Sequence, residues 1–255
     1  MSEGPYHRSG VAEGHASEHY PGPMHQPPVH RDTVHATHAP HHPKLQHHFD
    51  DMAQQTEAST LGMWVFLVTE IMFFGGLFMA YLVYRWQSPE GFAEASHHLN
   101  VTWGAVNTIV LIVSSLTMAL AVRSAQTSEP PKTQAMWIGA TMVFGLAFLG
   151  VKAIEYKDKF DHHLVPGPNF LWEGKHPAAA EMFYSLYFCM TGLHALHMVI
   201  GLGIMTVIGV MALRRQFDAN YYTPVEVSGL YWHFVDIVWI FLFPLLYLIG
   251  GHVVD

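Results

Sequence analysis

The chain has 255 residues, of which 51% are hydrophobic and 13% are charged, and its formal net charge at pH 7 is −8. Soluble domains usually carry about 25% charged residues. The composition therefore argues against a soluble protein, and the modest, dispersed negative charge argues against a nucleic-acid-binding surface. Because Cys189 is the single cysteine, the chain can form neither an intramolecular disulfide nor a paired-cysteine metal site. We interpret Cys189 as a small residue facing lipid or the protein core.

The first part of the chain, residues 1–58, is rich in His, Pro and Gly and has very few aliphatic residues. Such a segment buries too little apolar surface to offset the entropy lost on ordering, so it is predicted to be a mostly disordered tail. Its histidines, from His7 to His48, are irregularly spaced and no thiol accompanies them. Imidazole suits copper, zinc and nickel, but this spacing does not favour an ordered site, and we assign no metal ligand.

Five apolar segments follow within residues 59–255, and each is long enough to cross the roughly 30 Å hydrocarbon core of a bilayer as a helix. Nothing alternates polar and apolar residues with the period of two that a membrane β-barrel requires. We therefore predict an all-α integral membrane bundle of five transmembrane helices behind the N-terminal tail. The predicted helices span about residues 61–84, 103–122, 134–154, 182–213 and 228–249.

The connections between the predicted helices differ slightly in their content of Lys and Arg. Placing the N-terminus inside puts Arg123, Lys132, Arg214 and Arg215, together with Lys44, on the cytoplasmic side. Cytoplasmic connections of membrane proteins carry an excess of such cations. The sequence therefore predicts a cytoplasmic N-terminus and an external C-terminus.

Glu70 lies about ten residues into the first predicted helix, near the middle of the bilayer. An ionisable residue is costly in hydrocarbon and needs a partner or a function. Burial without a cation disfavours the charged carboxylate, so a neutral Glu70 that donates one hydrogen bond is expected. Its role is open between proton handling or ligand binding on one side and a structural interhelical hydrogen bond on the other.

Several other polar residues occur in pairs that share a helix face because they are three positions apart. Bis-histidine haem ligation by His194 and His197 would need matching histidines on a second helix, where His233 is the only candidate. We therefore favour the interpretation that the imidazoles of His194 and His197 form hydrogen bonds between helices. Lys152 and Glu155 form another pair, in which Glu155 binds locally or to a histidine. We predict a polar seam between helices formed by Asn107, Glu155, His194, His197, His233 and Asp236.

Five stretches of the chain, in order, resemble the helices of the cytochrome c oxidase subunit III family, in its short five-helix bacterial form. The resemblance covers roughly residues 58–250. The last two stretches are the closest, and the first contains the family's membrane-embedded glutamate, here Glu70. The stretches are TEIMFFGGLFMAY (Thr69–Tyr81), NTIVLIVSSLTMALA (Asn107–Ala121), VKAIEYKDKF (Val151–Phe160), TGLHALHMVIG (Thr191–Gly201) and YWHFVDIVWIFLF (Tyr231–Phe243).

The resemblance implies an accessory subunit of a haem–copper terminal oxidase, which reduces oxygen to water and pumps protons in the bacterial inner membrane. The haems and copper would lie in subunits I and II, and this chain would hold no cofactor and would not catalyse alone. It would pack against subunit I, bind phospholipid and support proton uptake. The implied partners also include subunit II, a small subunit IV, cytochrome c as electron donor and a respiratory supercomplex. Glu70 would be the family's carbodiimide-reactive carboxyl.

Three other readings remain open at the level of sequence. Subunit III of a quinol oxidase and the accessory protein of a nitric oxide reductase share the same signature helices. A proton-coupled transporter built around Glu70 and the His233–Asp236 pair belongs to another class. Such transporters often contain inverted repeats and helices broken at the midplane, whereas this chain shows no internal repeat and Pro244 lies near a helix end.

Overall fold

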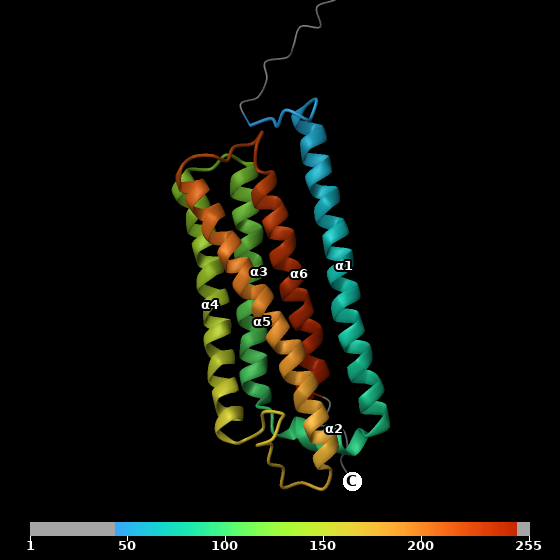
Figure 1. The fold of residues 1–255 in the computed structure, drawn as a ribbon. Coiled ribbons are helices and arrows are strands. Elements are labelled where there is room, and N and C mark those ends of the chain that lie inside the picture. Colours follow the sequence, from blue (N-terminus) through green and yellow to red (C-terminus); the bar gives the residue numbers. More distant parts are fainter. Residues whose placement is uncertain (1–43, 249–255) are drawn as a thin grey trace, which may run out of the picture. The chain divides into compact units, whose positions relative to one another are not determined.

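The structure is a computed structural model that describes residues 44–248, and within that range the chain is helical, without a β-strand (Figure 1). Five helices are long and apolar enough to cross a membrane, which confirms the predicted five-helix all-α membrane bundle. They are α1 (Met52–Gln87), α3 (Val101–Gln126), α4 (Pro131–Asp161), α5 (Pro177–Leu213) and α6 (Thr223–Phe243), the last continuing into the π-helical turn η1 (Pro244–Leu248).

The five long helices begin before the predicted apolar segments because polar and proline residues form their first turns. Asp51 caps α1, since its Oδ1 accepts a hydrogen bond from the Gln54 backbone N–H at 2.7 Å. Residues 52–58, predicted as part of the tail, therefore belong to α1. The remainder of the predicted tail up to residue 43, and the last residue of the predicted fifth helix, lie outside the described residues.

Proline begins most of the other helices. It occupies the first turn of α4, α5 and α6 as Pro131, Pro177 and Pro224. Proline is favoured there because its missing N–H would have no partner inside the helix, and its fixed φ suits helical geometry. Helix α3 begins differently, since Asn100 Oδ1 accepts hydrogen bonds from the N–H groups of Thr102 and Trp103.

A short helix, α2 (Pro89–His97), was not predicted and lies at one end of the bundle beside the start of α5 (Figure 1). Its Phe92 ring packs 5.4 Å from Tyr81 of α1 and 5.6 Å from Phe183 of α5, and all three rings are buried. The segment is too short to span a bilayer, so its apolar content alone predicts only a connection between two transmembrane helices. Its packing closes this end of the bundle.

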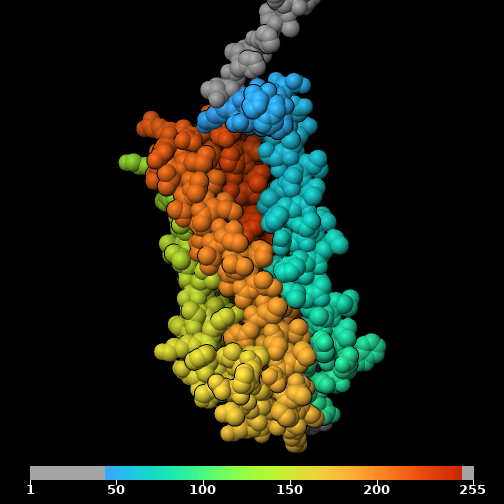
Figure 2. Space-filling view, viewed as in Figure 1, coloured from blue at the N-terminus to red at the C-terminus, as the bar shows by residue number. Residues whose placement is uncertain are grey.

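Helix α6 is the most buried of the five, with 56% of its most apolar 18-residue stretch inside the bundle, and α1 is the least buried, at 17%. Figure 1 shows α1 at the side of the bundle next to α6, and Figure 2 shows it diverging from α5 in the upper half of the view, where α6 is visible between them. The outer face of α1 is therefore apolar and uncovered within the described chain. Its exposed residues include Leu61, Val65, Val68, Ile71, Met72 and Met79.

Trp232 of α6 lies at the centre of the body that α3, α4, α5 and α6 form beside α1. A β-carbon added at Gly145 of α4 would lie 2.8 Å from the indole ring, and one added at Gly201 of α5 would lie 2.9 Å from it. The indole N–H donates to Ser114 Oγ of α3 at 3.0 Å. One fully buried side chain thus contacts α3, α4 and α5 at once, and the two glycines provide the space for it.

Gly145→Ala and Gly201→Ala are each expected to destabilise the chain by about 1–3 kcal/mol, because the added methyl group overlaps the buried indole. The matched controls are Gly139→Ala on α4 and Gly203→Ala on α5, where an added β-carbon would meet nothing within 4 Å. The controls are expected to be neutral or slightly stabilising, since alanine favours a helix over glycine. Thermal unfolding in detergent measures the difference, and equal midpoints for all four variants would contradict the packing argument.

Candidate functional site

The first polar contact joins α1 to α5 near the middle of the bundle. Glu70 Oε2 lies 3.2 Å from His197 Nε2, and the two side chains are 18% and 14% exposed, respectively. His197 Nδ1 lies 2.7 Å from the carbonyl oxygen of Leu193, one turn earlier on α5. Because a carbonyl oxygen only accepts hydrogen bonds, Nδ1 carries a proton and donates it. Glu70 therefore faces the ring nitrogen whose protonation is not fixed by the backbone.

Two protonation states satisfy this contact. In the first, a protonated Glu70 donates a hydrogen bond to a neutral imidazole. In the second, the carboxylate accepts one from an imidazolium ion. Both states contain the same number of protons and leave the pair without net charge, which avoids the cost of an isolated charge in hydrocarbon. His197 is thus the partner of Glu70.

Contacts from α1 and α6 hold His197 in place. Tyr231 Oη of α6 donates to the His197 carbonyl oxygen at 3.0 Å. The Phe74 ring of α1 lies edge-on to the imidazole, with 5.3 Å between ring centroids. Since Phe74 is one turn beyond Glu70, the same face of α1 supplies both the acid and the aromatic contact. The site joins α1, α5 and α6.

The second polar cluster surrounds a buried ion pair on α4. Lys152 Nζ lies 2.9 Å from Glu155 Oε2, and the two side chains are 4% and 8% exposed. Lys152 Nζ also donates to the hydroxyl oxygens of Tyr187 and Tyr247, at 3.1 and 2.9 Å. The two hydroxyls in turn donate to Glu155 Oε1 at 2.9 and 2.5 Å. All three ammonium protons therefore have acceptors, which is the condition for a buried ion pair to be tolerated.

Pro244 explains how Tyr247 reaches this cluster. Proline has no N–H to continue the helical hydrogen-bond pattern, so α6 ends at Phe243 and the chain continues as η1, with Tyr247 buried inside it. Sequence reasoning identified the Lys152–Glu155 pair but missed Tyr187 and Tyr247, which are 35 and 95 residues from Lys152. A buried tyrosine hydroxyl usually has a hydrogen-bond partner, so the position of Tyr187 inside an apolar helix could have indicated that it belongs to a polar cluster.

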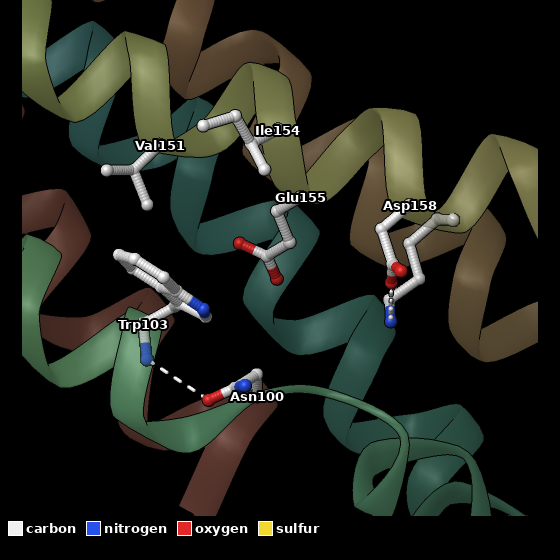
Figure 3. Close-up of a pocket in the computed structure, with 7 residues that line it drawn as sticks. Asn100, Trp103, Val151, Ile154, Glu155 and Asp158 are labelled. Atoms are coloured by element: carbon white, nitrogen blue, oxygen red, sulfur yellow. Dashed lines mark hydrogen bonds and ion pairs between the residues drawn. The ribbon is translucent and has the colours of Figure 1, made fainter.

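A cavity of about 200 Å³ adjoins the second cluster where α3 begins and α4 ends (Figure 3). The Glu155 carboxyl group borders it opposite the indole of Trp103, and Asp158 lies farther along α4. Asp158 forms an ion pair with Lys159 at 3.1 Å. Lys159 Nζ also donates to the His98 carbonyl oxygen at 2.8 Å, which ties α4 to the end of α2. The cavity is lined by Asn100, Trp103, Val151, Ile154, Glu155, Asp158 and Lys159.

A third polar group lies between α3 and α6. Ser115 Oγ is 2.7 Å from His233 Nδ1, and Asp236 lies one turn farther along α6, in the same cleft as both residues. Asp236 is 3% exposed, and neither of its carboxylate oxygens has a hydrogen-bond partner among residues 44–248. In the same part of the chain, no three His, Cys, Asp or Glu side chains converge as metal ligands would.

Two of the predicted site residues lie apart from these groups. His194 is buried with its imidazole against the rings of Phe148 and Trp239, each 5.4 Å away between centroids. Asn107 of α3 is 1% exposed. Neither side chain has a hydrogen-bond partner within residues 44–248.

The structure therefore places the predicted polar residues in separate groups rather than in one seam. An α-helix advances about 100° per residue, so residues three apart differ by about 60° in direction and can contact different neighbours. His197 accordingly contacts α1, whereas His194 points at Trp239 of α6. Glu155 binds Lys152, which is the local one of its two predicted partners, and not a histidine. The sequence pattern identifies the polar residues within helices and the local Lys152–Glu155 pair, but not which polar residues of different helices are in contact.

Comparison with known proteins places this bundle in a family. Residues 45–251 match the model of the family described as cytochrome c oxidase subunit III. The match covers every described helix. The chain belongs to this family. It is an accessory subunit III of the haem–copper oxidases.

Bacterial relatives of this subunit III come from two kinds of oxidase. Cytochrome bo(3) ubiquinol oxidase subunit 3 of Pseudomonas aeruginosa is 33% identical over 206 residues, which are 80% of this chain and 91% of the relative. Cytochrome c oxidase subunit 3 of Synechocystis sp. is 35% identical over 191 residues, 74% of each chain. A protein named probable quinol oxidase subunit 3 from Staphylococcus epidermidis is 26% identical, covering 79% of this chain and 94% of its own length.

Lys152→Met is expected to destabilise subunit III by about 3–5 kcal/mol, because it leaves the buried Glu155 without its cation. The double variant Lys152→Met/Glu155→Gln should recover much of that loss, since no unpaired charge remains. Lys157→Met, at an exposed position on the same helix, is the control and should change stability by less than about 0.5 kcal/mol. Thermal unfolding in detergent gives the comparison. If Lys152→Met behaves like Lys157→Met, the cluster does not stabilise the bundle.

Glu70→Gln is expected to leave assembly of subunit III intact, with a change in stability below about 0.5 kcal/mol, because the amide can still donate to His197 Nε2. The amide cannot exchange a proton with the imidazole, so we expect altered proton uptake or lipid packing in the assembled oxidase. Proton uptake measured during oxygen reduction, beside the exposed α1 control Glu57→Gln, tests this. A variant that fails to assemble would assign Glu70 a structural role.

Proposed function

We propose that this chain is subunit III of a proton-pumping cytochrome c oxidase in the bacterial inner membrane. The observation that carries the proposal is the family match over residues 45–251, which spans the complete five-helix bundle. In this proposal the haems and copper lie in subunits I and II, and subunit III carries no cofactor and contributes structure. Oxygen reduction is then an activity of the complex rather than of this chain alone.

The partners follow from the same proposal. Subunit I packs directly against the bundle, subunit II and a small subunit IV complete the enzyme, and the complex can join a respiratory supercomplex. Cytochrome c is the proposed electron donor. The N-terminus is placed in the cytoplasm and the C-terminus outside, which agrees with the small excess of Lys and Arg in the connections on the N-terminal side.

A groove between α1 and α6 supports binding of phospholipid. Its volume is about 480 Å³, and aromatic and aliphatic side chains supply nearly all of its lining. An acyl chain needs no hydrogen-bond partner and matches such a surface. The lining residues include Trp64, Ile71, Phe74, Phe78, Phe234 and Phe241. A lipid seated there would cover the less buried helix α1 on its α6 side.

The Glu70–His197 pair supports a role in proton uptake. The two groups exchange a proton without changing the charge of the pair, and both remain partly exposed, at 18% and 14%. A neutral pair of this kind can take part in proton transfer inside the membrane at low electrostatic cost. The Lys152–Glu155 cluster is saturated with hydrogen bonds and is better suited to holding α4, α5 and η1 together.

The test is purification of the tagged full-length chain in mild detergent from its native membranes. We expect a haem a-type reduced-minus-oxidised spectrum, two larger co-purifying subunits identified by mass spectrometry, and oxygen uptake driven by reduced cytochrome c. A parallel purification from membranes that contain the untagged chain is the control. A colourless, solitary and intact protein would contradict the oxidase assignment and would favour a transporter with Glu70 at its centre.

The same preparation distinguishes the electron donors. A quinol oxidase is the second candidate, because one relative with 91% of its length covered is named as a ubiquinol oxidase subunit. Oxygen uptake with a reduced quinol but not with cytochrome c would show that a quinol is the electron donor. The family assignment would be unchanged.

A further inference from the structure

The cleft between α3 and α6 combines a polar floor with an apolar rim. Its volume is about 490 Å³. Asp236, His233 and Ser115 provide its polar groups. The rim consists of aliphatic side chains that are about half exposed: Ile112 at 53%, Leu116 at 60%, Ile237 at 50% and Ile240 at 45%. The cleft therefore opens on the outer, membrane-facing surface of the bundle.

Asp236 is the feature of this cleft that lacks an explanation within the bundle. Its side chain is buried, yet neither carboxylate oxygen has a hydrogen-bond partner among residues 44–248. The neighbouring Ser115 Oγ lies 2.7 Å from His233 Nδ1 and also interacts with the Asp236 carboxyl group, so one hydroxyl is shared between two polar neighbours. A buried acid without a hydrogen bond costs several kcal/mol in an apolar medium. A donor from outside the described chain would remove this cost.

The depth of Asp236 restricts the source of that donor. The α6–η1 span runs from Thr223 to Leu248, and Asp236 is 13 residues from its start, near its middle. At 1.5 Å per residue this is about 20 Å from the helix end, so the carboxyl group lies near the bilayer midplane. Lipid headgroups do not reach that depth, and acyl chains have no hydrogen-bond donor. A side chain on another membrane-embedded protein segment can supply a donor at that depth.

We propose that the α3–α6 cleft is the docking site for a transmembrane helix of the haem-bearing partner subunit, and that this helix presents a hydrogen-bond donor to Asp236 at the bilayer midplane. The donor is a hydroxyl, amide, indole N–H or cationic side chain on an otherwise apolar helix face. The apolar face covers the aliphatic rim, and the donor satisfies the acid. The identity of the partner rests on the proposed function, whereas the location and chemistry of the site rest on the cleft itself.

A second copy of this chain fits the cleft poorly. A two-fold symmetric interface brings the same patch of each subunit together, which would set Asp236 against Asp236. Two such acids fit together only when at least one is protonated and donates its O–H to the other, whereas a donor on a partner helix can bind an acceptor oxygen of the acid in either state.

Site-specific photo-cross-linking in the intact complex tests the location. Leu116→p-benzoylphenylalanine places the probe on the rim of the cleft, and Val143→p-benzoylphenylalanine places it on an exposed, apolar position of α4 as the control. We expect the Leu116 probe to form an adduct with a transmembrane peptide of the haem-bearing subunit, at least about tenfold more than the Val143 probe. Adducts of Leu116 with lipid alone, or with a second copy of this chain, would overturn the proposal.

Substitution of the acid tests the chemistry. In detergent, Asp236→Leu should reduce retention of this chain in the complex by about five- to thirtyfold, the equivalent of one interhelical hydrogen bond in a membrane. Asp236→Asn keeps an acceptor oxygen and should lose less, and the exposed Asp161→Leu should lose nothing. Unchanged retention of Asp236→Leu would refute the role of the acid. If Asp236→Leu does not accumulate, Asp236→Asn and the Leu116 cross-link decide the question.

The proposed function is tested separately by these experiments. Co-purification of the unaltered chain with haem-bearing polypeptides depends on no single surface of the bundle. A complex that co-purifies while Leu116 cross-links only to lipid refutes the docking site and leaves the oxidase assignment in place. A chain that never co-purifies with haem refutes the oxidase assignment.

Discussion

The bilayer interior contains no water to hydrogen-bond polar groups, and the rest of this structure depends on that constraint. It requires helices, because only a helix satisfies the backbone of an isolated membrane segment. It also makes an ionisable side chain within the span costly unless that side chain has a partner. Glu70 has His197, and Lys152 has Glu155 and two tyrosines. Asp236, like His194 and Asn107, has no hydrogen-bond partner within residues 44–248, and of these three only Asp236 borders the α3–α6 cleft.

The apolar length of each segment was enough to predict the five-helix bundle, because membrane thickness alone sets that requirement. The same criterion could not find α2, whose nine residues are held by the packing of Phe92 rather than by lipid. Polar residues were identified correctly as belonging to helices, and the local Lys152–Glu155 pair was predicted, but the partners on other helices were not. Tyr247 meets Lys152 only because Pro244 ends α6 and reshapes the next turn, a tertiary consequence that no local spacing reveals.

The helices of the bundle differ in how extensively they pack against one another. Trp232 contacts α3, α4 and α5 from α6, and the glycines around it leave no space for a larger residue. Helix α1 is joined to the bundle through fewer buried side chains, and its outer face is apolar. Four helices thus form a tightly packed body, whereas α1 depends more on the Glu70–His197 contact and on whatever occupies its groove with α6.

The backbone hydrogen bond made by His197 has an electrical consequence. With Nδ1 committed to the Leu193 carbonyl, only the proton between Nε2 and Glu70 can move, and these two heavy atoms are 3.2 Å apart. Moving it converts a neutral acid and base into a dipole that spans two helices. A charge change in a neighbouring protein could therefore create or remove this dipole without any ion entering or leaving the membrane.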